Sequence, residues 1–300
     1  MYKSIFEQEL ANPTTNYFIL DTKGTEANTD GDIDFIRYGW ERSRFNKINS
    51  GDLFICRRPG KSSETGSFYF FGAAKMGRIE GEDRVIGEME KSLPFQSYLN
   101  PGDLNEFDWE WKTKGNDWQH FFNQYGMNQI PKDDFMGLMD MASIEMDDLY
   151  DPTVATHTIQ DIQNGNYRAE DEVSIGKKRT KQGVFSNKVK SNYNYECAIC
   201  QVRTKSFLVG SHIVPWSKNK DIRLDPANGL CLCTLHDKAF DKGYITVDKN
   251  GKVKLSTAVE QDEGLLNQLR EISDIKIKYP KKFKPKTEYL DYHYKEIFIK

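Results

Sequence analysis

The sequence predicts an α+β protein with two domains, and three features lead to that expectation. Residues 1–160 contain several short segments that are rich in aromatic and β-branched side chains and are bounded by turn residues, which favours a mixed α/β, barrel-like domain. Residues 183–300 contain a strand, a polar loop, a second strand and a helix, all framed by cysteine and histidine pairs. Between them, residues 161–182 are polar and poor in large apolar side chains, as expected of a linker.

The strands expected in the first domain are apolar runs that end at glycine, asparagine or aspartate. They are Asn16–Asp21, Asp52–Arg57 and Ser67–Ala74, with Lys75–Ile79 and Asp83–Ile86 as extensions of the same sheet. Phe35–Phe45 is ambiguous, and apolar residues at helical spacing predict a helix over Asp133–Asp148. In the second domain we expect a leading helix, an extended basic segment with two prolines, and a closing helix, over Gly183–Tyr193, Ile275–Lys286 and Glu288–Phe298.

The composition is that of a globular protein of the cell interior. Hydrophobic residues make up 38% of the chain and aromatic residues 13%, which suffices for packed cores. There is no run of about 18 apolar residues that could span a membrane, and residues 1–7 do not resemble a signal peptide. We therefore expect a cytoplasmic protein without a membrane partner.

The net charge of −3 hides an asymmetry between the two halves of the chain. Residues 1–165 hold 16 Lys and Arg against 28 Asp and Glu, or −12, whereas residues 166–300 hold 26 against 17, or +9. Because phosphate binding requires clustered Lys and Arg, the second half is the expected nucleic-acid footprint. The alternative is a solvated basic face without a partner.

Four residues have the spacing of a structural zinc site. Cys197 and Cys200 form a C-x-x-C knuckle. Cys233 and His236 form a C-x-x-H pair at the start of the expected helix, and Cys231, which has no such partner, is expected to be a packing residue. Two pairs of this kind complete a tetrahedral zinc shell, which would stabilise a module with little core of its own. The alternative is a set of reduced core cysteines with a surface histidine.

Four more polar residues belong to the same unit: His212, Asn228, Asp237 and Asp241. His212 ends an apolar strand, Asn228 follows a polar loop, and the two aspartates share one face of the expected helix. With the phrases SHIVPW and NGLCLCTLHDKAFDKG, residues 193–248 resemble the HNH, or ββα-metal, endonuclease family. The nine-residue step from Asn228 to Asp237 and the zinc frame agree with that family. The resemblance implies a nuclease with one divalent ion at the strand–helix junction, usually Mg²⁺.

The resemblance and the chemistry of phosphodiester hydrolysis together suggest a role for each residue. A neutral histidine can accept a proton from the attacking water near pH 7, so His212 is the expected general base. Asp237, with Asp241 as a second or water-mediated ligand, would bind Mg²⁺ or Mn²⁺, because oxygen ligands suit these ions. By carry-over from the family, Asn228 orients His212 or fixes the loop. Ser211 departs from the family, in which Asp or His is common at that place.

Each of these assignments has a structural alternative. His212 could be a satisfied surface histidine at a strand end, and Asn228 could belong to an Asn-Gly turn. Asp237 could be an acidic residue that interacts with the helix dipole, and Asp241 a residue of the helix surface.

The first domain is the expected selector, because a nuclease domain that contacts mainly the phosphate backbone has little selectivity of its own. The phrases YFIL, GW-x-x-x-R-F-x-x-I-x-x-GD-LFICRR and FYFFGAAKMGRI loosely resemble PUA-like barrels, including EVE- and SRA-type base readers. That resemblance implies that a flipped modified base stacks on Tyr38 or Trp40, with Arg57 in a local basic rim. The alternative is that the aromatic side chains belong to the core.

These expectations combine into a restriction-type DNA endonuclease that its first domain directs to modified double-stranded DNA. Zinc would be structural, and Mg²⁺ or Mn²⁺ would be catalytic. A homodimer would allow both strands to be cut, because an HNH domain grips one strand at a time. Two alternatives stay open: an HNH restriction endonuclease that recognises an unmodified sequence, and a zinc-structured DNA-binding protein that does not cut.

Overall fold

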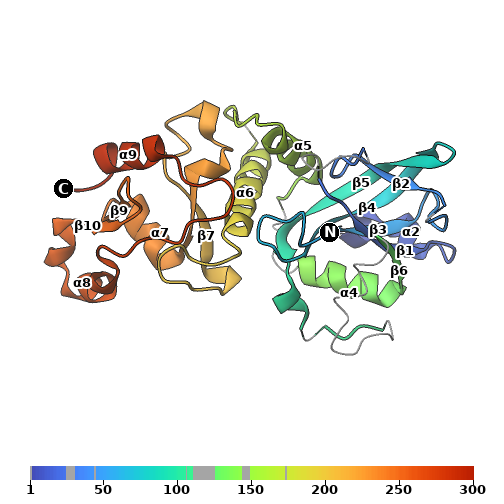
Figure 1. Ribbon diagram of the computed structural model, residues 1–300, viewed down its shortest axis with the longest axis horizontal. Coiled ribbons are helices and arrows are strands. Elements are labelled where there is room, and N and C mark those ends of the chain that lie inside the picture. The colour runs from blue at the N-terminus through green and yellow to red at the C-terminus, as the bar shows by residue number, and fades with distance from the viewer. Residues whose placement is uncertain are drawn as a thin grey trace. The chain divides into compact units, whose positions relative to one another are not determined.

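The computed structural model of the protein describes residues 2–24, 31–43, 45–105, 107–110, 126–143, 149–172 and 174–300. The chain divides into two compact units. The first comprises residues 1–163 with 174–180, and the second comprises residues 164–173 with 181–300. Each unit combines helices with strands, which confirms the α+β class (Figure 1).

The first unit is built on a six-stranded mixed sheet with the strand order β2-β5-β4-β3-β1-β6 (Figure 1). β1 and β3 are parallel, and the other neighbouring pairs are antiparallel. The register of β4 shifts against both β3 and β5, and because such bulges bend and twist a strand, the sheet curls into a half-barrel. The strands span Tyr17–Asp21 (β1), Arg37–Glu41 (β2), Leu53–Arg58 (β3), Tyr69–Glu80 (β4), Arg84–Leu99 (β5) and Met127–Ile130 (β6).

Helices pack on both faces of this sheet. Side chains alternate along each strand, so each face carries apolar residues for a helix to contact. On one face, Phe18 and Leu20 of β1 belong to a hydrophobic cluster against which Ile159 of α5 packs. On the other face, the ring of Tyr17 lies 5.1 Å from that of Phe135 in α4. The helices of this unit are α1 (Tyr2–Ile5), α2 (Glu7–Ala11), α4 (Lys132–Ser143) and α5 (Pro152–Gln163), with a 3-10 turn over Pro101–Leu104.

The second unit contains a strand–strand–helix core. β7 (Leu208–His212) and β8 (Gly229–Cys233) form an antiparallel pair, and α7 (Thr234–Asp241) follows β8 directly and packs against both strands. α6 packs on the same pair: a Cβ at Gly210 would lie 2.6 Å from Cα of Ser186, so glycine permits the close approach. The other elements are α6 (Ile175–Asn192), β9 (Ile245–Val247), β10 (Val253–Leu255), α8 (Glu263–Leu269) and α9 (Thr287–Glu296), with 3-10 turns over Lys205–Phe207, Lys220–Ile222, Pro226–Asn228, Thr257–Gln261 and Arg270–Ile272.

Two boundaries differ from those that the sequence predicts. α6 begins at Ile175 rather than near Gly183, so the expected linker over residues 161–182 holds the end of α5 and the first turns of α6. Those first turns are rich in Lys and Arg, which favour helix but form no apolar stripe that a pattern search would detect. The helix expected over Asp133–Asp148 ends at Ser143, and residues 144–148 lie outside the described residues.

Within the described ranges, no helix combines the length and the apolar character that crossing a bilayer requires.

Candidate active site and metal centre

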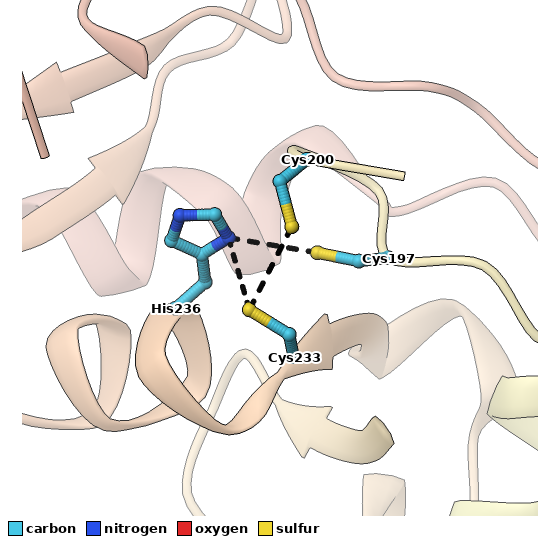
Figure 2. Close-up of side chains that lie close together, drawn as sticks. All are labelled: Cys197, Cys200, Cys233 and His236. Atoms are coloured by element: carbon cyan, nitrogen blue, oxygen red, sulfur yellow. Dashed lines mark hydrogen bonds between the residues drawn. The ribbon is translucent and has the colours of Figure 1, made fainter. Parts of the chain in front are cut away.

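Three cysteines and one histidine of the second unit point toward a common centre (Figure 2). The Nδ1 atom of His236 lies 3.6 Å from Sγ of Cys197 and 3.4 Å from Sγ of Cys233. The Sγ atoms of Cys200 and Cys233 are 3.7 Å apart. A tetrahedral zinc ion would separate two sulfurs by about 3.8 Å and a sulfur and a nitrogen by about 3.6 Å, given its usual bond lengths. The four donor atoms therefore fit one tetrahedral zinc ion.

The chain reaches this centre through two tight local structures. In the knuckle, the carbonyl of Cys197 accepts the amide of Gln201 at 3.1 Å, and Gln201 adopts a left-handed φ of 62°. Cys233 ends β8 and caps α7, which places His236 in the first turn of that helix. Cys231 is fully buried and lies outside this donor set, as expected of a packing residue, and burial raises the pKa of its thiol to about 12. Protein atoms fill all four positions, as in a structural site.

His212 is the last residue of β7, and its ring is held from several sides. Its Nε2 lies 2.9 Å from the main-chain oxygen of Arg223. A carbonyl oxygen can only accept, so Nε2 carries the proton and Nδ1 carries the lone pair. The ring stacks on Phe185 with centroids 3.7 Å apart and meets Trp216 edge-on at 5.6 Å. Burial lowers the pKa of His212 to about 4, so the imidazole is neutral at pH 7.

Arg223 also fixes, through its side chain, the loop whose carbonyl accepts this hydrogen bond, and its sequence context does not predict that role. Its guanidinium donates to the carbonyls of Trp216 at 2.7 Å and Ala169 at 2.9 Å, and it pairs with Asp171 at 2.8 Å. The residue is buried. A single arginine in the polar loop KNKDIRLDPANG carries no signal that separates it from the neighbouring lysines, because its partners come from a distant segment.

Asn228 lies fully buried where the loop returns to β8. Its Oδ1 accepts the amide of Val214 at 2.8 Å, and its Nδ2 donates to the carbonyl of the same residue at 3.1 Å. Its own carbonyl accepts the amide of Ile213 at 2.9 Å. These bonds fasten the main chain directly after His212, which favours the loop-fixing role over contact with a substrate.

Ser211, Asp237 and Asp241 contribute oxygen atoms between β7 and α7. Burial and the nearby Asp241 raise the pKa of Asp237, and the Ser211 hydroxyl, which faces this carboxylate, opposes the shift. Asp241 is an exposed residue whose carboxylate is partly desolvated, which raises its pKa. The Ser211 Oγ is buried, and no group among the described residues, Asp237 included, meets the geometry of a full hydrogen bond with it. The Ser211 hydroxyl faces the Asp237 carboxylate, and the Asp241 carboxylate is close enough to raise the pKa of Asp237. Oxygen donors of this kind fit a hard cation such as Mg²⁺ or Mn²⁺.

The three residues expected to bind a base lie in the first unit and differ in exposure. Tyr38 is buried, and its hydroxyl donates to a main-chain carbonyl at 3.2 Å. Arg57 is fully buried, and its guanidinium pairs with both carboxylate oxygens of Asp21 at 2.5 and 2.6 Å. Trp40 is only half-buried, and its Nε1 donates to the carbonyl of Phe45 at 3.0 Å. The contacts of Tyr38 and Arg57 are structural, so Trp40 is the one candidate of the three with an accessible part.

Comparisons with known proteins bear on the second unit. A family model described as HNH endonuclease matches residues 197–248. A solved structure titled "Modification dependent TagI restriction endonuclease" is similar over 93% of this chain and 80% of that chain, with 12% sequence identity and a TM-score of 0.28. No curated protein matches this chain. The matched residues include the metal centre and the strand–strand–helix core with His212, Asn228 and Asp237. Residues 197–248 are therefore an HNH endonuclease domain, and the protein is a nuclease whose implied substrate is DNA.

Proposed function

We propose that the protein is a metal-dependent DNA endonuclease in which His212 is the general base. The observation that carries this proposal is the hydrogen bond from Nε2 of His212 to the carbonyl of Arg223. It leaves the Nδ1 lone pair to take the proton from a water molecule that attacks phosphorus. Contacts with Phe185 and Trp216 hold the plane of the ring, so the base is oriented before the substrate arrives.

Asp237 would bind the catalytic cation, with Asp241 and the Ser211 hydroxyl beside it. A divalent cation supplies stabilisation of the negative charge that develops on the phosphate and on the leaving 3′ oxygen. The oxygen donors suit Mg²⁺ or Mn²⁺, whereas the thiolates of the Cys₃His cluster suit zinc. The zinc ion would be structural and would join the knuckle to the start of α7, the helix that carries Asp237.

We further propose that the first unit directs the nuclease to modified DNA. The acidic first half, with a net charge of −12 over residues 1–165, disfavours a broad phosphate-binding face and favours a small reading site. Trp40 lies on the edge strand β2 of the curled sheet, and the part of its side chain that is not packed against the core would stack on a base. Two copies of the chain would cut the two strands of a duplex. The alternative within the same class is a restriction endonuclease that recognises an unmodified sequence.

Digestion of matched plasmids that differ only in cytosine modification tests both parts of the proposal. Nicking in the presence of Mg²⁺ and its loss when the divalent cation is omitted from protein that retains its zinc would support the metal-dependent chemistry. Preference for the modified plasmid would support the reading unit, and Trp40→Ala should then weaken binding to that DNA by roughly 1–3 kcal/mol, as for one base–aromatic stack. Equal cutting of both plasmids would contradict modification dependence and leave the nuclease proposal intact.

A further inference from the structure

A basic segment of the second unit, Lys278–Lys286, runs along the HNH domain without helix or strand and is called the basic strap below. Its first residue is anchored beside the metal centre. The amide of Lys278 donates to the carbonyl of Ala198 at 2.8 Å, inside the cysteine knuckle. The Nζ atom of Lys278 lies 2.6 Å from the carboxylate of Glu196, whose side chain is buried next to the first zinc cysteine.

The last residue of the basic strap is anchored beside the active-site loop. The amide of Lys286 donates to the carbonyl of Ala227, the residue directly before Asn228. The Nζ atom of Lys286 lies 2.8 Å from the buried carboxylate of Asp225, and the hydroxyl of Tyr289 donates to the same carboxylate at 2.9 Å. The basic strap therefore connects the metal centre to the loop that positions His212.

The middle of the basic strap is held by residues of α6. Asn192 of α6 donates from Nδ2 to the carbonyl of Phe283 at 3.3 Å, and Nζ of Lys188 lies 5.3 Å from the centre of the Phe283 ring (α6 and the strap lie side by side in Figure 1). Pro280 and Pro285 are buried and restrict the backbone on both sides. Three exposed lysines stand between these anchors: Lys281, Lys282 and Lys284.

We infer that the basic strap is the surface along which the domain binds the phosphate backbone of double-stranded DNA. This inference rests on the proposed function and adds a location to it. The residues from Lys281 to Lys284 span at most about 10 Å, which is close to the rise of three base pairs, about 10 Å. Neighbouring lysines can therefore contact neighbouring phosphates. Because the strap is anchored at both ends, binding costs little additional ordering of the chain.

The position of the basic strap also relates it to the proposed active site. Its far end bonds to Ala227, next to Asn228, and Asn228 in turn fastens the residues after His212. A DNA backbone that binds along these lysines would therefore extend toward His212, the proposed general base. Sequence-independent phosphate contacts of this kind set the register of a duplex without reading its bases.

The test is the salt dependence of DNA binding by the full-length protein. Binding of a fluorescent duplex is measured by anisotropy between low and moderate salt, without added Mg²⁺ or Mn²⁺. The triple variant K281Q/K282Q/K284Q should reduce the slope of log K against log salt by about 2–3, because each lost phosphate contact removes about 0.9. The arginine variant K281R/K282R/K284R should keep the wild-type slope.

A matched control removes three lysines elsewhere in the same unit. K254Q/K295Q/K300Q lowers the net charge equally, with Lys254 on β10, Lys295 in the last turn of α9 and Lys300 four positions after that helix ends. Its slope should stay near that of the wild type. Equal slopes for the glutamine strap variant and the wild type, or equal losses in both triple variants, would overturn the inference. Zinc content confirms that each variant is folded.

Cleavage of the same duplex in Mg²⁺ by the wild type separates the two proposals. If the wild type cuts and the glutamine strap variant binds DNA as the wild type does, only the inference about the basic strap is contradicted. If the salt dependence shows binding through the basic strap but the wild type does not cut, only the proposed nuclease chemistry is contradicted.

Discussion

His212 and Arg223 are joined by a hydrogen bond of 2.9 Å from the imidazole Nε2 to a main-chain oxygen, and this bond selects the nitrogen that can act as a base. The accepting loop depends on the Arg223 side chain, which bonds to Ala169 and Asp171, respectively 54 and 52 positions earlier in the chain. The tautomer of His212, the proposed general base, therefore depends on a segment that lies outside the residues matched by the HNH family model.

Replacement of His212 by alanine should lower DNA cleavage by roughly two or more decades, the usual size for a lost general base. Binding of DNA and zinc content should stay near wild type, because the described partners of the ring, Phe185, Trp216 and Arg223, belong to neither the metal centre nor the basic strap. A plasmid-nicking time course measures the rate. His157→Ala, on the exposed side of α5, is the matched control and should cut like the wild type. Wild-type cleavage by His212→Ala would place the active site elsewhere.

Asp237→Ala should also lower cleavage by decades and should weaken the dependence of the rate on Mg²⁺ concentration, because the carboxylate is the main proposed ligand. Titration with Mn²⁺, followed by the electron paramagnetic resonance signal of the free ion, measures binding independently of activity. The control is Asp262→Ala, which removes the N-cap of α8 and leaves the oxygen donors at α7 unchanged. Unaltered Mn²⁺ binding in Asp237→Ala would exclude this residue as the ligand.

Purified protein should contain about one tightly bound zinc ion per chain, and Cys197→Ser should lose it and become less soluble. Metal content by atomic absorption measures this directly. Cys231→Ala is the informative control, because this thiol lies outside the donor set and its loss should leave zinc bound. Zinc retained in full by Cys197→Ser would contradict the tetrahedral assignment.

Stability of the second unit should fall between pH 7 and pH 5 in a way that depends on His293. This side chain is buried, its Nδ1 lies 2.8 Å from the Thr246 hydroxyl, and its ring stacks on Phe240 at 3.6 Å. Burial lowers the pKa of His293 to about 4. The unfolded chain therefore binds a proton below about pH 6.5 that the folded chain does not bind until about pH 4, so stability is complete above pH 6.5 and is lost as the pH falls.

Between pH 7 and pH 5 this histidine should contribute a loss of about 2 kcal/mol in the free energy of unfolding. Urea unfolding of the wild type and of His293→Gln at both pH values measures the difference. The variant should be less stable at pH 7 and should show a pH dependence smaller by that amount. The same pH dependence in both proteins would show that His293 is not the responsible group.

A fragment that begins at Asn164 should fold with zinc and nick DNA weakly, without regard to modification. A fragment that begins at Lys177 should be less active, because it lacks Ala169 and Asp171, the anchors of Arg223. The fragment over residues 1–160 should not cut but should discriminate between DNA substrates. Gel shifts with modified and unmodified duplexes and a nicking assay compare the three. If the C-terminal fragments discriminate between modified and unmodified DNA, the proposal that the first unit reads the modification is contradicted.

Local spacing made much of this protein predictable from its sequence. The strands β1 and β3 follow from short apolar runs between turn residues, and the two x-x pairs identified Cys197, Cys200, Cys233 and His236 as one cluster. Such signals are readable because the interacting residues lie within a few positions of each other, where helix and strand geometry determine which side chains share a face.

Tertiary structure decided what local spacing does not contain. Tyr38 and Arg57 looked available in a basic, aromatic stretch, but the curled sheet encloses both, and Arg57 pairs with Asp21 across 36 positions of the chain. The anchors of Arg223 and the approach of the Ser211 hydroxyl to Asp237 likewise arise only after distant segments pack together. The sequence by itself determined the HNH endonuclease domain over residues 197–248 and the four side chains of the Cys₃His cluster, because both reside in short motifs. The protonated nitrogen of His212 and the burial of the candidate base readers depend on contacts between residues far apart in the chain, and only the folded structure brings those together.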